Sequence, residues 1–233
     1  MAAGEGDQPV LPVALCGGLR INVAEGIPRI YKTRTRAEII WPDEDFAAFA
    51  TASEKLSVAH ANDGLRLAAL TGPRREDLVT SSRSDVSAYA PIKEAAKASR
   101  GKRRTVVLPL YPALNCLLAE PKTPKRDDGV QTVLVNSQGQ PWSGDGLGGS
   151  FNRERDSAGI EHLDPETGER RARHLHDVRR TFCTTLITLA KLSSQKAAEI
   201  MGWSPGQVAG IRRSLVDQGA VNMAIAERLR DTL

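Results

Sequence analysis

The chain has 233 residues, of which 40% are hydrophobic and 26% charged, and its formal net charge at pH 7 is +4. A chain of this length can bury a substantial core in one domain, and the lack of any apolar run of roughly 18 to 20 residues excludes a membrane-spanning helix. Three widely separated cysteines, Cys16, Cys116 and Cys183, suggest neither a disulfide framework nor a metal cluster. We therefore expect a cytoplasmic protein with no membrane partner, no metal and no other cofactor.

The first 35 residues differ in character from the rest of the chain. Glycines surround a short apolar piece there, and Glu5 and Asp7 stand where a secretory signal would carry basic residues. We therefore expect residues 1–35 to form an N-terminal segment and residues 36–233 to form one folded domain.

Two helices are predicted soon after residue 36. Asp43 is a good N-cap for a helix from Pro42 to about Ser53, in which Phe46 and Phe49 share one face. A second helix is predicted over residues 57–70. It ends at Thr71-Gly72-Pro73 because glycine and proline terminate helices.

Short strands and a helical second half are predicted next. β-Branched and apolar residues favour strands over residues 84–92, 105–110 and 132–135, and a basic run between the first two forms the tip of a hairpin. Beyond Pro112 helices are predicted over residues 112–119, 145–155, 177–190, 194–200, 205–217 and 219–230. The sequence therefore predicts an α+β fold, mainly α-helical, with a small three-stranded antiparallel sheet.

The segment His176-Asp177-Val178-Arg179-Arg180-Thr181-Phe182 carries the strongest chemical signal. In a helix the apolar residues of this region form one stripe: Val178, Phe182, Leu186 and Leu189. His176 and Arg179 lie beside each other at the edge of that stripe. Such a pair can hold one phosphate, since a guanidinium offers two oxygens a planar fork and an imidazole can transfer a proton. An isolated H-x-x-R is common by chance, so taken alone it favours a structural role.

Further segments give the H-x-x-R motif a context. Thr71-Gly72-Pro73-Arg74-Arg75-Glu76-Asp77-Leu78 precedes it, and Met201-Gly202-Trp203-Ser204 follows it. Between the first segment and H-x-x-R, the basic run Ser99-Arg100-Gly101-Lys102-Arg103-Arg104 leads into Leu108-Pro109-Leu110. In order and spacing, over about residues 20–230, these segments resemble the T-G-x-R-x-x-[ED]-L, hairpin, H-x-x-R and G-[HW]-S boxes of the tyrosine recombinases, the family of the phage-type integrases. The resemblance, which extends to residues 36–41 and 136–142, implies the DNA breaking-rejoining catalytic fold of that family.

The resemblance also implies a role for each matching residue. Arg74 and Arg179 would grip the scissile phosphate and stabilise the negative charge of its transition state without a metal. His176 would act as the acid/base group. Trp203 would buttress the phosphate, and Asp77 would orient an arginine.

Basic residues cluster in the hairpin and near the H-x-x-R box, where they can neutralise DNA phosphates. The resemblance implies that Lys97, or alternatively Lys102, is the hairpin lysine that protonates the leaving 5′ oxygen. The residues that we expect to contact DNA are Arg100, Lys102, Arg103, Arg104 and Arg173. The expected partners are therefore double-stranded DNA and other recombinase protomers.

The chain departs from the family pattern at the nucleophile. The segment that resembles I-R-R-x-Y-V-D reads Ile211-Arg212-Arg213-Ser214-Leu215-Val216-Asp217, so Leu215 stands at the position of the tyrosine. The tyrosines of the chain, Tyr31, Tyr89 and Tyr111, all precede the H-x-x-R box, and leucine has no hydroxyl with which to form a phosphotyrosyl link. The resemblance begins near the family's interdomain linker, so we expect residues 1–35 to include a linker remnant and the N-terminal core-binding domain to be absent.

These observations predict a DNA-binding protein of the integrase or site-specific recombinase type. It would act in DNA recombination or in the integration of a mobile element, with catalysis impaired by Leu215. Whether it is an enzyme stays open, because another protomer can supply a nucleophile in trans, or water can replace the tyrosine. The alternatives are a non-catalytic partner of an active recombinase and a helix-turn-helix regulator. The latter is suggested by the spacing of Ala198, Gly202, Ser204 and Val208.

Overall fold

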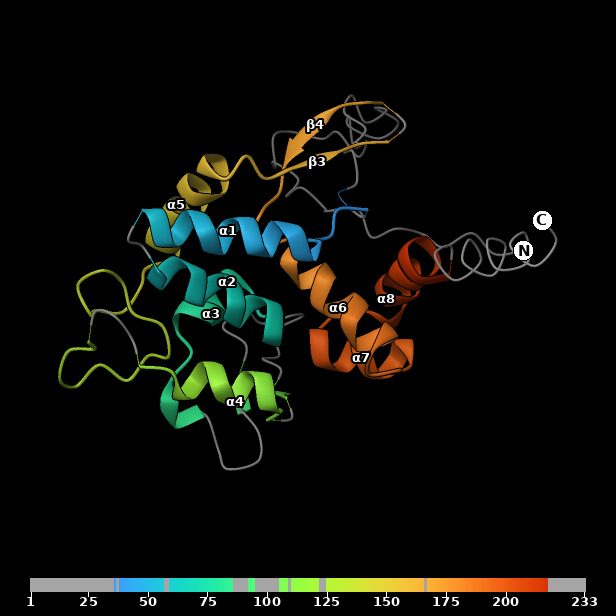
Figure 1. Cartoon of the computed structure of the whole chain (residues 1–233). Coiled ribbons are helices and arrows are strands. Elements are labelled where there is room, and N and C mark those ends of the chain that lie inside the picture. The colour runs from blue at the N-terminus through green and yellow to red at the C-terminus, as the bar shows by residue number, and fades with distance from the viewer. Residues whose placement is uncertain are drawn as a thin grey trace, which may run out of the picture. The chain divides into compact units, whose positions relative to one another are not determined.

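The computed structural model describes residues 36, 38–56, 59–85, 92–94, 105–108, 110–121, 125–165 and 167–217. In this part of the chain helices predominate and strands are short (Figure 1). The helices are α1 (Asp43–Lys55), α2 (Ala59–Thr71), α3 (Arg75–Val79), α4 (Pro112–Ala119), α5 (Gly144–Ser157), α6 (Val178–Thr188), α7 (Ser194–Met201) and α8 (Pro205–Ile211), with a 3₁₀ turn η1 (Arg83–Asp85) and a π-helical turn η2 (Arg212–Asp217). The strands are β1 (Ile92–Glu94), β2 (Thr105–Val107), β3 (Glu161–Leu163) and β4 (Arg170–Ala172). The predicted mainly helical fold is confirmed, and the helix expected over residues 219–230 lies outside the described residues.

Helix α1 begins with acidic residues and packs into the core through its aromatic residues. The prediction of Asp43 as the N-cap is wrong, since Pro42 holds the extended N-cap conformation and Asp43 is the first helical residue. In the first turn its carboxylate still interacts favourably with the positive end of the helix dipole. Phe49 is fully buried and Phe46 partly buried, and their rings lie 6.1 and 5.4 Å from that of Trp41. The predicted apolar face is therefore confirmed.

The described strands form two separate antiparallel pairs instead of the predicted three-stranded sheet. β1 pairs with β2 from Ile92↔Val107 to Glu94↔Thr105, on either side of the basic segment as expected. The position predicted for the first strand, residues 84–92, is wrong, since Ser84 and Asp85 lie in η1 and β1 begins at Ile92. The tip of this hairpin, residues 95–104, lies outside the described residues. The β3–β4 pair was not predicted, because its strands are mostly charged and contain no β-branched residue.

The third predicted strand, over residues 132–135, is wrong. Val133, Leu134 and Val135 are all buried, whereas a strand in a sheet with one solvated face buries alternate residues. The segment forms isolated bridges, one of them between Val135 and Pro141. A turn then follows, in which the backbone N–H of Asn136 donates to the carbonyl oxygen of Gln140 (2.8 Å). The prediction rested on apolar content alone, which does not distinguish a buried loop from a strand.

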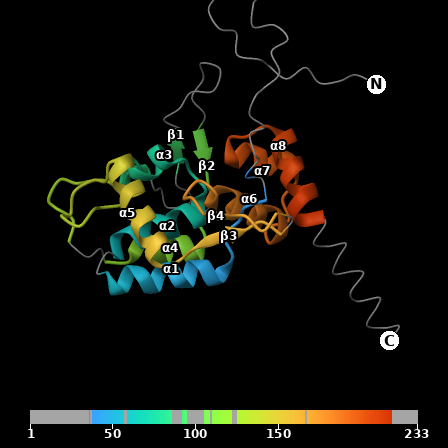
Figure 2. The ribbon, with the colours of Figure 1, turned by 90° about the horizontal axis from the view of Figure 1, so that it is seen from above.

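Helix α6 joins two hydrophobic cores. The first core lies among α1, α2, α3, α4 and α5 and includes Val178 of α6. The second core lies among α6, α7 and α8 and includes Phe182. Figures 1 and 2 both show α6 between α2 and α7. The predicted apolar stripe of α6 is correct except for Leu189, which is 79% exposed because the helix ends at Thr188.

Gly72 allows the end of α2 to lie close against α6. It has a φ of +60°, and a Cβ atom there would lie 2.3 Å from Phe182. Gly202, after α7, has a φ of +63° but no atom within 4 Å of its Cβ position. We expect Gly72→Ala to lower the free energy of unfolding by about 2 to 3 kcal/mol, from left-handed strain plus displacement of Phe182. Gly202→Ala should cost about 1 kcal/mol from strain alone. Urea denaturation measures both, and equal losses would contradict the close contact.

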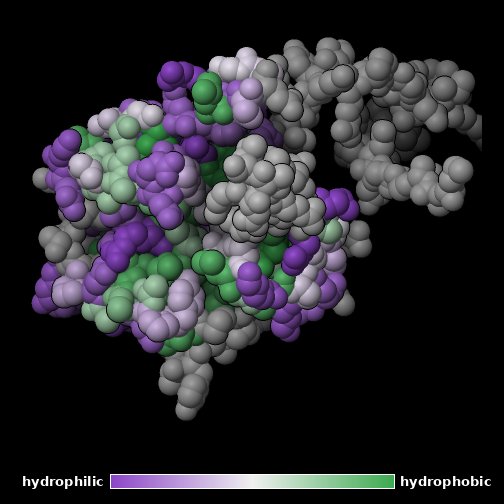
Figure 3. All heavy atoms as spheres, turned by 45° about the vertical axis from the view of Figure 1, so that its right-hand side comes forward, coloured by the Kyte–Doolittle hydropathy of each residue, from purple (hydrophilic) through white to green (hydrophobic). Residues whose placement is uncertain are grey.

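On the face shown in Figure 3, hydrophilic residues lie around smaller hydrophobic areas. Among the described residues, the large hydrophobic side chains that are exposed are Leu56, Leu163 and Leu189. They come from three different parts of the fold, after α1, in β3 and after α6. No helix within the described ranges is long and apolar enough to cross a membrane.

Candidate functional site

The side chain of Arg179 lies where three segments from distant parts of the chain meet. Its Nε–H donates to the carbonyl oxygen of Gly72 (2.9 Å), and an Nη2–H donates to that of Met201 (3.0 Å). Its guanidinium carbon lies 5.2 Å from the centre of the Trp203 ring, within the range of a cation–π interaction. The T-G-x-R, H-x-x-R and G-W-S motifs therefore meet at one guanidinium.

Burial and neighbouring charges both act on Arg179. The residue is 4% exposed. Desolvation, and after it the positive charge of Arg74, lowers the pKa of its guanidinium to about 10. The negative charge of Asp77 acts in the opposite direction and raises this pKa. Arg179 is thus still protonated at neutral pH. Asp77 is itself buried in α3. Because a bound anion would offset the repulsion between the two arginines, this cluster suits a phosphate.

Arg74 and His176 belong to the same electrostatic cluster. Arg74 is half-buried and holds the extended N-cap conformation before α3. The pKa of His176 is lowered from 6.5 by desolvation first, then by the charges of Arg179 and Arg180, with a smaller effect of Arg74. The imidazole is therefore neutral at pH 7, where it can take up a proton. The structure brings together the three residues that the sequence predicts to hold one phosphate.

Trp203 is positioned by the turn between α7 and α8. Gly202 ends α7 in the left-handed conformation. Ser204 begins α8 with a capping box, in which its hydroxyl accepts from the N–H of Gln207 while the Gln207 side chain accepts from the N–H of Ser204. Trp203 lies between these two caps, partly buried against the second core. The G-W-S motif thus ends one helix, begins the next and directs an indole ring to Arg179.

The turn that carries His176 is held by an ion pair that the sequence did not reveal. Asp177 is 1% exposed. Its carboxylate accepts hydrogen bonds from Arg36 (3.2 and 2.6 Å) and from the backbone N–H of His174 (2.8 Å). Such a bidentate pair fixes orientation as well as adding energy. Arg36 lies in a segment that the resemblance covers, but nothing in the sequence pairs it with Asp177.

Leu215 packs into the domain. It lies in η2, and its side chain is partly buried against the second core. The neighbouring Ser214 is exposed, and its hydroxyl donates to the carbonyl oxygen of Gly210 (3.1 Å). At the predicted position of the nucleophile the chain therefore has a hydrocarbon side chain that serves the core.

The residues predicted to contact DNA from the hairpin cannot be placed in the site. Outside the described residues lie Lys97, Arg100, Lys102, Arg103 and Arg104. Arg173 is described, and its side chain is 12% exposed and paired with Asp45 (2.5 Å). It also donates to the backbone carbonyl of Ile40. These contacts engage the guanidinium within the fold, which favours a structural role for Arg173 over a contact with DNA.

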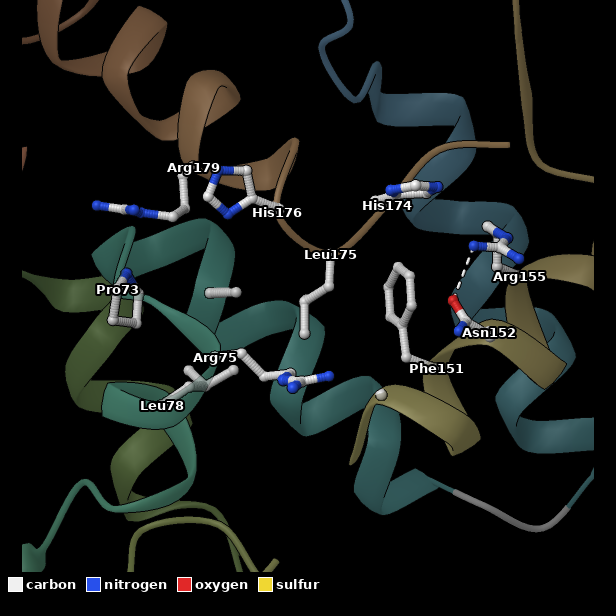
Figure 4. Close-up of a pocket in the computed structure, with 12 residues that line it drawn as sticks. Pro73, Arg75, Leu78, Phe151, Asn152, Arg155, His174, Leu175, His176 and Arg179 are labelled. Atoms are coloured by element: carbon white, nitrogen blue, oxygen red, sulfur yellow. Dashed lines mark hydrogen bonds between the residues drawn. The ribbon is translucent and has the colours of Figure 1, made fainter. Parts of the chain in front are cut away.

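A pocket of about 450 Å³ opens beside Arg179 and His176 (Figure 4). Its walls come from α3, from α5 and from the segment that leads into α6. Basic side chains line it at several points, and none of the described residues that line it is acidic. Within the described ranges, no group of three or more His, Cys, Asp or Glu side chains is placed to hold a metal ion. Two of its arginines form ion pairs, Arg75 with Asp145 (3.2 Å) and Arg155 with Asp156 (2.6 Å). The end of the pocket at Arg179 and His176 is therefore the part that favours an anionic ligand.

Solved structures with a similar fold include integrases and recombinases. A lambda integrase dimer bound to a COC′ core site matches with a TM-score of 0.60 and 18% identity, over 76% of this chain and 60% of that chain. The lambda integrase catalytic core matches with a TM-score of 0.55 and 19% identity, over 70% and 90%. The chain has the tyrosine recombinase catalytic fold. XerH site-specific recombinase bound to a palindromic difH substrate also matches it, with a TM-score of 0.58 and 16% identity, over 87% and 57%.

The likeness to tyrosine recombinases concerns the fold, since the three identities given above are below 20%. No protein-family model matches the sequence, and no curated protein does. The chain spans 60% of the lambda integrase chain in the dimer. The tyrosine recombinase fold and the meeting of three motifs at Arg179 are independent observations, one from backbone shape and one from side-chain geometry.

Proposed function

We propose that the chain binds DNA in the manner of a tyrosine recombinase and acts in DNA recombination or in the integration of a mobile element. The observation that carries this proposal is the junction at Arg179, where the guanidinium binds Gly72 and Met201 and faces Trp203. Asp77 offsets part of the repulsion between Arg179 and Arg74, and a bound anion would offset more of it. A DNA phosphate is the anion that best fits the fold.

In this proposal Arg74 and Arg179 hold one backbone phosphate, and His176 transfers a proton to or from it. Asp77 and Trp203 keep the arginines in position. The hairpin lysine, Lys97 or Lys102, would approach the same phosphate. Because Leu215 has no nucleophilic atom, the chain holds the phosphate without forming a covalent link. A non-catalytic partner of an active recombinase is the role that such a site supports best.

The proposal predicts that Arg74→Gln weakens DNA binding. Removing one phosphate contact should lower the affinity for a short DNA duplex about tenfold and reduce the slope of log affinity against log salt by about 1. The charge-matched control is Arg66→Gln, because Arg66 pairs with Glu120 (2.6 Å) at the junction of α2 and α4. Fluorescence anisotropy over a salt series measures both variants. Equal affinities for the two variants would contradict a phosphate site at Arg74.

A helix-turn-helix regulator remains the second candidate, because α7, the turn at Gly202 and the capped start of α8 have that form. The two candidates differ in their prediction for Arg74, which lies outside α7 and α8. A helix-turn-helix surface would bind DNA equally well with and without Arg74→Gln. The same salt series therefore distinguishes them.

A further inference from the structure

The pocket in Figure 4 is larger than one phosphate needs. Arg179 and His176 lie at one end of it, and Asn152 and Arg155 lie at the other. Its volume of about 450 Å³ is within the roughly 300 to 1,000 Å³ that small-molecule sites occupy. A phosphate against Arg179 and His176 would therefore leave room for a second group toward α5.

The wall of the pocket between these ends is apolar. Leu175 and Phe151 extend into the space between His176 and Asn152, and Leu78 and Ala68 contribute to the lining from α3 and α2. Phe151, Leu78 and Ala68 belong to the first core and are at most 2% exposed, so among these apolar side chains it is the partly buried Leu175 that presents surface to the pocket. An apolar side chain of this kind can pack against the face of a flat ring.

Hydrogen-bond donors surround this apolar wall. The Oδ1 atom of Asn152 accepts a hydrogen bond from Arg155 (2.8 Å), which is in turn held by Asp156 (2.6 Å). The amide nitrogen of Asn152 consequently lies on the side away from Arg155 (Figure 4). Arg75 also lines the pocket. Its guanidinium pairs with Asp145 through Nη2 (3.2 Å) and with Glu76 through Nε (3.5 Å), and its Nη1 donors make no hydrogen bond to another described residue. The pocket thus offers donors to a ligand that carries carbonyl or phosphate oxygens.

We propose that this pocket takes the base of an unpaired nucleotide whose phosphate lies against Arg179 and His176. A pyrimidine such as thymine has a flat apolar ring, a methyl group and two carbonyl oxygens, which match the wall and the donors of the pocket. A base inside a duplex cannot enter, because it is stacked and paired and would first have to leave the helix. The inference rests on the proposed function, since it assumes the phosphate site, and it adds a preference for unpaired strands.

Titration of the full chain with three probes tests this inference. We expect thymidine 5′-monophosphate to bind about tenfold or more tightly than inorganic phosphate, because the base adds contacts that phosphate cannot make. Thymidine, which lacks the phosphate, should bind more weakly than the monophosphate. Chemical-shift changes in an NMR titration give the three affinities.

Two neighbouring glycines of α5 provide a variant and its control. Gly148 lines the pocket, and the nearest atom to a Cβ there would be an Nη of Arg75, at 3.0 Å. Gly149 is exposed, with no atom within 4 Å of its Cβ position. Gly148→Leu should reduce the affinity for the monophosphate to that for phosphate and leave phosphate binding unchanged. Gly149→Leu should bind all three probes as the unchanged chain does.

The outcomes separate this inference from the proposed function. Phosphate binding without a gain for the monophosphate would overturn the nucleotide pocket and leave the phosphate site intact. Failure of both phosphate and monophosphate to bind would overturn the proposed function as well. Equal losses in Gly148→Leu and Gly149→Leu would show that the monophosphate binds elsewhere and would also overturn the inference.

Discussion

Arg179→Lys is expected to lower the free energy of unfolding by about 2 to 3 kcal/mol, because a lysine cannot reach two carbonyl oxygens at once and leaves one buried acceptor unsatisfied. Arg179 binds the carbonyls of Gly72 and Met201 at 2.9 and 3.0 Å from within the fold. The substitution retains the positive charge, so the loss reports geometry more than charge. Urea denaturation monitored by circular dichroism gives the two free energies.

The matched control for this prediction is Arg66→Lys. Arg66 also makes two hydrogen bonds, both to Glu120 at 2.6 Å, but its side chain is 40% exposed. An exposed pair of this kind contributes at most about 1 kcal/mol. If Arg179→Lys lowers the free energy of unfolding no more than Arg66→Lys does, the junction of the three motifs does not depend on the guanidinium.

Leu215→Tyr is expected to turn a chain that forms no covalent DNA link into one that does. The substitution supplies a hydroxyl at the position where the resemblance places the tyrosine, and a positioned nucleophile is what the proposed phosphate site needs to form a covalent link. The ring can replace the contacts that Leu215 makes with the second core. Incubation with supercoiled and nicked plasmid, without metal, followed by denaturing electrophoresis detects the adduct.

Leu215→Phe is the control, since it has the same ring without the hydroxyl. The unchanged chain and Leu215→Phe should give neither an adduct nor relaxed plasmid. An adduct formed by the unchanged chain would show that another residue is the nucleophile. If Leu215→Tyr binds DNA but forms no covalent adduct, the phosphate is not held in a geometry that a tyrosine at position 215 can attack, which would contradict the proposed site.

Helix positions could be predicted because helices leave local signals, whereas the meeting of the motifs was implied by the resemblance to the tyrosine recombinases. The turn at Gly72 ends α2 through its backbone conformation, and the same turn carries the motif with Arg74. In α6, periodic apolar residues predicted the buried face and placed Arg179 beside it. The prediction that Leu189 is buried was wrong, because the spacing of apolar residues continues past the end of the helix whereas their burial does not.

Contacts between distant charged residues could not be predicted. Arg36 and Asp177 are 141 positions apart. Nothing in the sequence around either residue distinguishes it from a charged residue on the surface. The ion pair of Arg173 with Asp45 likewise leaves no pattern in the sequence, so Arg173 was expected to be free to contact DNA. Ion pairs of this type depend on the tertiary fold, which brings the partners together after the local elements have formed.

The pKa of His176 is the most direct measure of whether Arg74, His176 and Arg179 surround one phosphate. In the free chain desolvation and the neighbouring arginines hold this pKa below 6.5. A phosphodiester between them adds a negative charge that stabilises the imidazolium, so binding of a short DNA duplex should raise the pKa of His176 by about one unit. His60 is buried in α2 against Trp142 and provides an internal control. NMR titration of the histidine ring protons with and without duplex should show a rise for His176 and none for His60, and an unchanged pKa of His176 in a chain that has bound DNA would contradict the phosphate site.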